Sequence, residues 1–236
     1  MDGTDLGWYL SSGGSSEGGA KSATPIVDAT DNNVFADVSS AARSAGGTEI
    51  RKIFLENDHA TDPYDPHSIW ISTAPSHCTA ELGLGFDDVD DDEPTGGNLV
   101  AFGAAAQVAF VSDAADDRSV DVHGQVAGVP TIETVVLNGT SEVLTAAAFD
   151  VVDAMHTVVS ASRTVSIAEG SGGTVRGTID PGVANCFRWQ AAASKSAGIW
   201  RPSLVAGASE GIWERISWSA GAIVGVQDVP LATEAI

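Results

Sequence analysis

Short apolar runs separated by turn residues constrain this chain more than any other feature. Between residues 99 and 179 the runs hold Val, Ile, Ala and Thr, and Gly, Asn or Asp stand between them. A new run begins roughly every 8–12 residues, a spacing typical of all-β sandwiches. We therefore predict an all-β fold, with strands in this region at 99–102, 107–112, 118–126, 131–137, 141–147, 155–161, 163–169 and 174–179.

The segment VVLNGT at residues 135–140 carries the clearest turn signal of the series. Asn-Gly between two apolar runs favours a two-residue hairpin turn of type I′, in which both central residues have a positive φ angle. We therefore predict a hairpin with Asn138 and Gly139 at its tip. The segment brings no nucleophile, base or ligand cluster, so we interpret it as scaffold.

The N-terminal part shows the same type of structure. Residues 48–58, 68–73 and 77–86 are predicted strands, because apolar and polar or glycine positions alternate along them. The Gly/Ser-rich segment 11–23 is predicted to be a flexible arm that orders against a partner. The acidic segment 87–98 ends in Pro and Gly-Gly and is predicted to be an exposed linker at a domain boundary.

The charge of the chain excludes whole classes of partner. The formal net charge is −21, with 32 acidic residues and only the lysines Lys21, Lys52 and Lys195. Such a surface repels a nucleic-acid backbone and an anionic membrane, so we expect neither as a partner. An excess of acid with few lysines is typical of proteins that work in high salt; the alternative is a GC-rich source with an acidic surface that maintains solubility.

Membrane and export signals are also missing from the sequence. No apolar run approaches the roughly 18 residues of a membrane span. The first residues, MDGTDLGWYLSSGG, have neither a basic stretch nor an apolar core of a signal peptide, so folding in the cytoplasm is expected.

The residues needed for catalysis do not form a recognisable pattern. There is no G-x-S-x-G motif, and EGSGG at 169–173 joins two predicted strands without a following Lys-Ser or Lys-Thr. We therefore expect no enzymatic activity. A β-sandwich hydrolase with paired carboxylates is the third and least favoured alternative, because 32 acidic residues supply candidates that sequence alone does not eliminate.

Metal ligands are present in number but not in a metal-binding spacing. The run Asp87, Asp88, Asp90, Asp91 and Asp92 is a weak candidate for Ca²⁺ or Mg²⁺, but it lacks the EF-hand spacing, and a solvated linker is the favoured interpretation. Among the histidines, His67 and His77 are the one pair that flanks a predicted hairpin. We expect no cofactor.

The two cysteines lie far apart in the sequence. Neither Cys78 nor Cys186 stands in a C-x-x-C motif, so a zinc site of the usual spacing is excluded. A single disulfide between them stays open as an alternative.

Six tryptophans are the most informative aromatic residues. Trp70 and Trp213 lie within predicted strands and are assigned to a core. Trp189, Trp200 and Trp218 are candidates for a subunit interface or for a groove that binds a sugar, with a core or interface position favoured over the carbohydrate site.

Two distant segments together resemble a known kind of protein. NNVFADVSSAARSAGGTEIRKIFLENDHATDPYDPHSIWIST, followed by TAELGLG, and the later LVAGASEGIWERISWSAGA resemble the two halves of one domain in structural (virion) proteins of tailed phages and related tailed viruses. GQVAGVPTIETVVLNGTSEVLTAAAFDVV between them resembles β modules of phage head and tail proteins. The chain departs from the pattern at Glu214, where a second basic residue is usual.

The resemblance implies an interrupted outer domain. Residues 1–96 and 184–236 would form one β-sandwich, Ig-like or jelly-roll-like, with a second β-sandwich at 97–183 inserted into it, at a loop whose ends lie close together. It also implies a non-enzymatic part of the virion, as a capsid decoration, turret, neck or tail component. The protein would be made in the host cytoplasm and would bind copies of itself and other virion proteins. The acidic composition suggests a halophilic host, and a receptor- or glycan-binding module on the virion surface is the alternative function.

Overall fold

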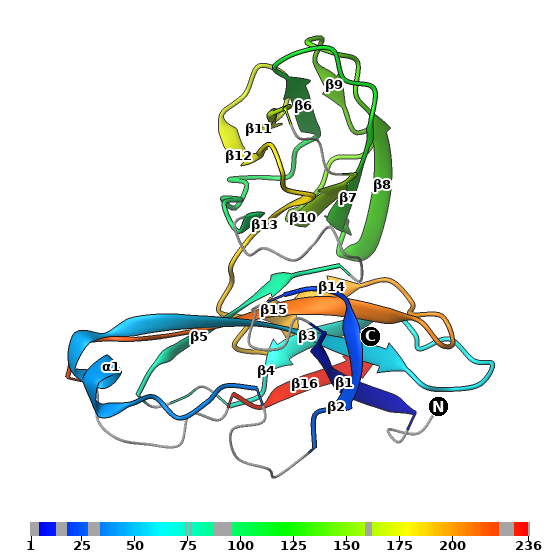
Figure 1. The fold of residues 1–236 in the computed structure, drawn as a ribbon. Helices are drawn as coiled ribbons and strands as arrows, with labels where there is room; N and C mark the ends of the chain where they lie inside the picture. Colours follow the sequence, from blue (N-terminus) through cyan, green and yellow to red (C-terminus); the bar gives the residue numbers. More distant parts are fainter. Residues whose placement is uncertain are drawn as a thin grey trace. The chain divides into compact units, whose positions relative to one another are not determined.

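The computed structural model describes residues 5–12, 18–27, 34–73, 75, 77–86, 96–158, 162–221 and 229–235. The chain divides into two compact units. Unit 1 comprises Met1–Asp92, Gln190–Ile199 and Ser203–Ile236, and unit 2 comprises Glu93–Trp189 and Trp200–Pro202. Both units consist of antiparallel β-sheets, so the prediction of an all-β fold is confirmed (Figure 1).

Unit 1 is built on a five-stranded sheet whose middle strands come from distant parts of the chain. Strand β15 lies between β3 and β5 and pairs with β3 over ten residue positions, from Ser209 opposite Glu56 to Trp218 opposite Gly47. The sheet is therefore complete only when the segment that follows unit 2 has joined the segment that precedes it. Its order is β2 (Lys21–Pro25), β1 (Leu6–Ser11), β3 (Gly47–Asn57), β15 (Ser209–Trp218) and β5 (Thr79–Leu84).

A smaller sheet and one short helix lie outside the five-stranded sheet. The three-stranded sheet has the order β14 (Ile199–Arg201), β4 (His67–Ile71) and β16 (Leu231–Ala235). Helix α1 (Ser40–Ala45) begins at Ser39, whose side-chain oxygen accepts a hydrogen bond from the backbone N–H of Ala42 at 3.2 Å, and it ends at Gly46 with φ +76°. A 3₁₀ turn, η2, spans Lys195–Ala197.

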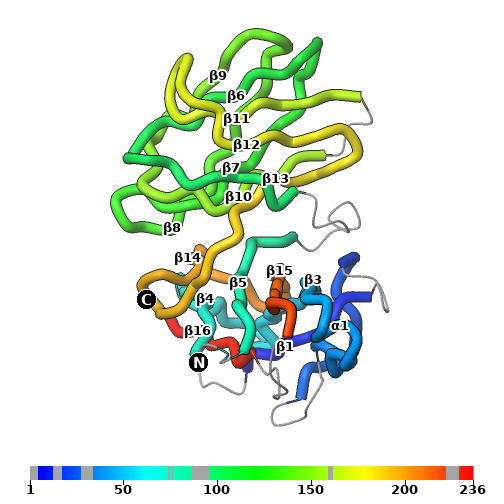
Figure 2. The backbone as a smooth tube through the Cα atoms, turned by 90° about the vertical axis from the view of Figure 1, so that its left-hand side faces the viewer, coloured from blue at the N-terminus to red at the C-terminus, as the bar shows by residue number. Residues whose placement is uncertain are grey.

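Unit 2 is a sandwich of two four-stranded sheets, drawn in green and yellow in Figure 2. One sheet has the order β13 (Asn185–Phe187), β10 (Val151–Thr157), β7 (Ser119–Val126) and β8 (Val129–Val136). The other has the order β12 (Val175–Ile179), β11 (Val165–Glu169), β6 (Val108–Ser112) and β9 (Val143–Leu144).

The core of unit 2 lies between its two sheets. Side chains at alternate positions of β6, β7 and β11 point into it, as the period of two in a β-strand requires. The buried cluster includes Val108 and Phe110 of one sheet and Val120, Val122 and Met155 of the other. The alternation of the sequence therefore carries real information on which face is buried.

The structure corrects the prediction of a type I′ hairpin at VVLNGT. Strands β8 and β9 belong to different sheets, so the segment crosses from one sheet to the other. The turn has Asn138 and Ser141 at its ends, with Ser141 N–H donating to the Asn138 carbonyl at 3.0 Å, and Gly139 with φ +58° inside it. Asn138 itself has no positive φ. Leu137 fills the core shared by both sheets, and after it the chain continues to β9 of the facing sheet instead of returning along β8.

A hairpin turn of the predicted kind occurs earlier, between β7 and β8. Its central residues are Ala127 with φ +50° and Gly128 with φ +75°, between the paired Val126 and Val129. Positive φ at both central residues is the property of a type I′ turn. Ala127 is an unusual residue there, which is why the sequence signal was missed.

The structure also bears on the predicted arm, on one predicted strand and on the two cysteines. The ends of the predicted arm 11–23 pair with each other, because β1 and β2 form a hairpin and Ser12 N–H donates to the Ala20 carbonyl at 2.7 Å; residues 13–17 lie outside the described part. Residues 99–102 form no strand. Cys78 and Cys186 are both free thiols, so no disulfide joins them.

Candidate functional site

Strand β8 lies at one edge of its sheet, as do the five-residue strands β2 and β16 of other sheets. The edge of β5 is covered by Gln190, which exchanges two backbone hydrogen bonds with Leu82, and the edge of β12 is covered by Val100, whose N–H donates to Arg176. Strands β9, β13 and β14 are two or three residues long. With eight residues, β8 is the longest edge strand in the part of the chain that the structure describes.

The backbone of β8 offers hydrogen-bonding groups on its free side. Leu137 N–H donates to the Arg118 carbonyl at 2.9 Å and fixes which residues point toward β7. Because backbone groups alternate along an antiparallel strand, the N–H and C=O groups of Ile132, Thr134 and Val136 point away from β7. Within the described residues no hydrogen bond to these groups is found.

The same three residues place their side chains on the outer face of the sheet. Val135 is directed into the core and is 7% exposed, so its neighbours in the strand are directed outward. Ile132 is 46% exposed and Val136 is 59% exposed. Val129 is also exposed, at the start of the strand. An apolar edge with free backbone groups is a template for another strand, and natural proteins normally protect such edges.

Contacts on both sides of the strand hold β8 in place. The carboxylate of Glu133 accepts hydrogen bonds from the backbone N–H groups of Ala146 and Ala147, the second at 3.1 Å. On the outer face, Thr134 donates its hydroxyl hydrogen to Asp121 at 2.5 Å. The charged residue of the strand is therefore engaged within unit 2 and leaves the free side uncharged.

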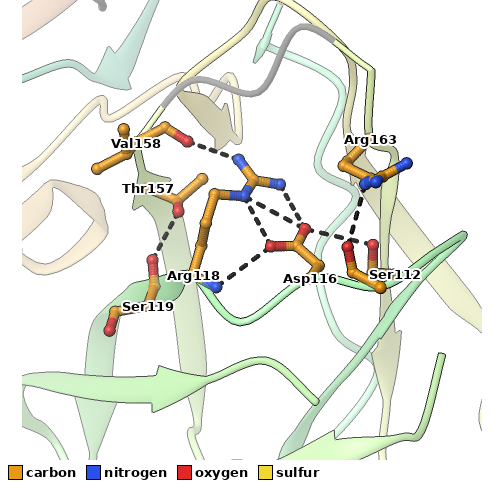
Figure 3. Close-up of polar contacts among 8 residues, drawn as sticks. Ser112, Asp116, Arg118, Ser119, Thr157, Val158 and Arg163 are labelled. Carbon is orange, nitrogen blue, oxygen red and sulfur yellow. Dashed lines mark hydrogen bonds and ion pairs between the residues drawn. The ribbon is translucent and has the colours of Figure 1, made fainter. Parts of the chain in front are cut away.

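A polar cluster anchors the strand next to β8 (Figure 3). The guanidinium of Arg118 binds the Asp116 carboxylate through Nε at 2.9 Å and Nη2 at 2.7 Å, and its Nη1 donates to the Val158 carbonyl at 2.5 Å. Ser112 donates to the same carboxylate at 3.3 Å, so the cluster joins the end of β6 to the start of β7. These hydrogen bonds from Arg118 lower the pKa of Asp116. The Asp116 and Arg118 side chains are thus bound to each other and to neighbouring groups, which indicates a structural role.

Unit 1 contains an unusual buried acid, Glu214. Its side chain lies on β15 beside Ile212 and Ile216 and opposite Leu82 of β5, all of them buried. Its Oε1 has no hydrogen-bond partner among the described residues, and burial raises the pKa of Glu214 to about 8. Burial also raises the pKa of the Cys78 thiol, and the charge of Glu214 adds to that increase.

Arg51 of β3 stands opposite Glu214 but does not neutralise it. Its guanidinium lies over the ring of Phe35 at 5.8 Å and donates to the Ile50 carbonyl at 2.7 Å. Burial in this setting favours the protonated form of the Glu214 carboxyl group. Alternation in the sequence places Glu214 on the same face of the strand as the buried Ile212 and Ile216.

The three candidate tryptophans have separate surroundings. Trp218 donates its indole N–H to the Ala42 carbonyl at 3.2 Å, and its ring lies against Gly47. Trp189 packs edge-on against Phe187 with ring centroids 5.1 Å apart. Trp200 is half-buried, as are the other two. Trp213 is fully buried, as expected for the core, whereas Trp70 is partly exposed.

The candidate metal ligands do not converge in the described residues. Asp87, Asp88, Asp90, Asp91 and Asp92 lie outside them. His67 is buried and its Nε2 lies 2.6 Å from Glu210, whereas His77 is exposed. No group of three or more His, Cys, Asp or Glu side chains arranged to hold a metal ion occurs in the part that the structure describes. The described helices include none long and apolar enough to cross a membrane.

Comparison with protein-family models, with curated proteins and with solved structures finds no match for this chain.

Proposed function

We propose that this chain is a non-enzymatic structural protein of a tailed virus particle, in a capsid decoration, turret, neck or tail, and that it acts through subunit interfaces. The observation that carries the proposal is the uncovered edge of β8, with Ile132 and Val136 exposed on a strand whose outward backbone groups have no partner in the described residues. An assembly protein needs such a surface, since burial of apolar area and strand pairing both stabilise a subunit contact.

The sequence supports the location of that interface in a virion. Two segments resemble the halves of a domain in tailed-virus structural proteins, and the strands that they contain, β3 and β15, pair along their length. The net charge of −21 fits a particle that stays soluble in the cytoplasm of a halophilic host, where hydrated cations surround the carboxylates.

The described tryptophans give a glycan-binding module less support. A sugar-binding groove needs aromatic rings presented together to solvent. Trp189 and Trp218 instead pack against Phe187 and Gly47, and all three candidates are half-buried. We therefore rank subunit contacts above carbohydrate binding.

The test is to find the chain in particles. Density-purified tailed particles that contain the gene for this chain should yield its peptides by mass spectrometry in a fixed ratio to the major head or tail protein. A mature particle that lacks the peptides would contradict the proposal. Purified protein that remains a monomer and binds glycans on an array would instead support the receptor-binding function.

A further inference from the structure

We propose that the partner of the β8 edge is the β8 edge of a second copy of this chain, paired antiparallel about a two-fold axis through Thr134. The inference deepens the proposed function and rests on it, because it names the occupant of the same surface. It would join two four-stranded sheets into one eight-stranded sheet.

The backbone of β8 is complementary to itself in one register. With Thr134 opposite Thr134 of the second copy, Ile132 faces Val136 and Val136 faces Ile132. Each of these residues has outward N–H and C=O groups, so the three pairs can exchange six hydrogen bonds, the count that follows from two bonds for each hydrogen-bonded pair. Pro130 has no N–H, and in this register it lies just beyond the three pairs.

The side chains support the same register. Ile132 and Val136 lie on one face of the sheet, and pairing brings each beside the other residue of the second copy. Cross-strand pairs of β-branched residues stabilise a sheet. Pairing would cover Ile132, now 46% exposed, and Val136, now 59% exposed. These are the most exposed apolar side chains on the outer face of the strand.

The charge distribution favours a second copy over a charged partner. The outward positions 130, 132, 134 and 136 are Pro, Ile, Thr and Val, with no charge to attract a basic protein. Two copies nevertheless each carry −21, so they repel at long range. Salt screens this repulsion, since the Debye length falls from about 10 Å at 0.1 M to about 3 Å at 1 M. Self-pairing should therefore strengthen with salt, whereas attraction to a basic partner would weaken.

The first experiment measures self-association of the full chain by sedimentation velocity. Raising KCl from about 0.1 M to about 2 M should lower the dimer dissociation constant at least about tenfold. Thr134→Pro removes an outward N–H without removing a bond to β7, so it should abolish the dimer, while Thr134→Val keeps the backbone and should retain it. Circular dichroism of each variant confirms that it has folded.

A disulfide test gives an independent result without relying on a disruptive variant. In a Cys78→Ser background, Thr134→Cys places two thiols across the axis with Cα atoms about 5.5 Å apart, within the range that a disulfide spans. Mild oxidation should give a covalent dimer. Val175→Cys is the matched control, because Val175 is 57% exposed at the edge of the other sheet, and it should give no covalent dimer.

The outcomes separate this inference from the proposed function. A chain that stays monomeric at both salt concentrations, or a dimer that survives Thr134→Pro while Thr134→Cys gives no disulfide, overturns the self-pairing. If the chain is then still found in purified particles, the structural function stands and the contact is with another protein. A dimer of the predicted register in a chain absent from particles would uphold the pairing and contradict the virion function.

Discussion

Two buried carboxyl groups, one in each unit, differ in whether a basic side chain lies beside them. Asp153 in unit 2 is 1% exposed, and its Oδ1 lies 3.0 Å from Nη2 of Arg188, whose backbone N–H also donates to the Asp153 carbonyl. Glu214 in unit 1 is equally buried but has apolar neighbours and an Oε1 without a partner in the described residues. The Asp153 carboxylate thus lies beside a guanidinium, whereas burial raises the pKa of Glu214. Unit 1 also contains a buried acid with a partner, because Glu210 lies 2.6 Å from Nε2 of His67.

This difference predicts which change should destabilise each unit, the loss of a partner in unit 2 and a change of pH in unit 1. A buried carboxylate with a guanidinium partner makes the native state depend on that partner. A buried carboxyl without a partner makes the native state depend on pH. The surface of unit 2 that we expect to associate is a different one, the edge of β8. Apolar side chains are exposed there and the outward backbone groups are uncovered.

The largest expected effect is the pH dependence of unit 1. Glu214 has a pKa raised from 4.5 to about 8 in the folded chain, so the folded state holds a proton that the unfolded state releases. Its contribution to stability is fully present below about pH 4.5 and is lost as the pH rises through 8, a loss of about 5 kcal/mol. Urea unfolding between about pH 5 and 9 should show the free energy of unfolding falling with pH.

Glu214→Gln isolates this effect, because the amide keeps the shape of the side chain and does not titrate. The variant should lose most of the slope between pH 5 and 8 and should unfold at higher urea than the wild type at pH 8.5. Glu234→Gln, at a side chain 65% exposed, is the control that should leave the slope unchanged. An identical slope for Glu214→Gln and wild type would show that Glu214 titrates normally.

The next largest effect is expected from the ion pair of unit 2. Arg188→Met leaves the Asp153 carboxylate buried without its guanidinium, which should lower the free energy of unfolding by about 3 kcal/mol. The double variant with Asp153→Asn should recover much of that loss, since the uncompensated charge is then gone. Thermal unfolding of the wild type, the two single variants and the double variant gives the interaction energy between Asp153 and Arg188. A double variant no more stable than Arg188→Met would contradict this explanation.

A smaller loss should follow from the Asp116 cluster. Asp116→Asn removes the charge that three hydrogen bonds from Arg118 now meet and should cost about 1–3 kcal/mol at pH 7. Because the folded pKa of Asp116 is lowered, its contribution is present above its usual pKa and is lost as the pH falls below it. Wild type and variant should therefore converge in stability in acid; a constant difference down to low pH would argue against the ion pair.

Substitutions on β8 should have the smallest effect on the free energy of unfolding and the largest effect on assembly. Ile132→Thr with Val136→Thr alters two exposed side chains and should change the free energy of unfolding of the monomer by less than about 0.5 kcal/mol for each. The same double variant should weaken the dimer, because the cross-strand apolar pairs are lost. Unfolding measured at low protein concentration separates the two effects, and a large loss of monomer stability would show that these residues support the fold.

The sequence predicted most strands because alternation and turn residues are local signals. Residues 48–58 and 118–126, for example, were placed close to β3 and β7. The sheet that a strand enters is not local, which explains the error at Asn138 and Gly139, where the chain crosses between sheets. Strand β8 is predicted as 131–137. Its position at the edge of the sheet depends on the rest of the fold, because no other described strand pairs with its outer side.

Most of the candidate site could not be predicted from the sequence, because it too depends on which strands lie side by side. The burial of Glu214 depends on β5 and β3 lying on either side of β15. The exposure of Ile132 and Val136 could not be read from a run of apolar residues that resembles its buried neighbours. The residue type alone marked three tryptophans as candidates, Trp189, Trp200 and Trp218. Trp189 and Trp218 make separate contacts, which no spacing in the sequence predicts.

Amide hydrogen exchange of the full chain, measured as protein concentration rises, tests the β8 edge most directly. Pairing predicts that the amides of Ile132, Thr134 and Val136 exchange more slowly in the dimer, while those of Val175–Ile179 on β12 do not change. Mass spectrometry of peptides that cover Val129–Leu137 resolves the two cases. A chain that associates with no slowing of exchange in Val129–Leu137 would contradict assembly through this edge.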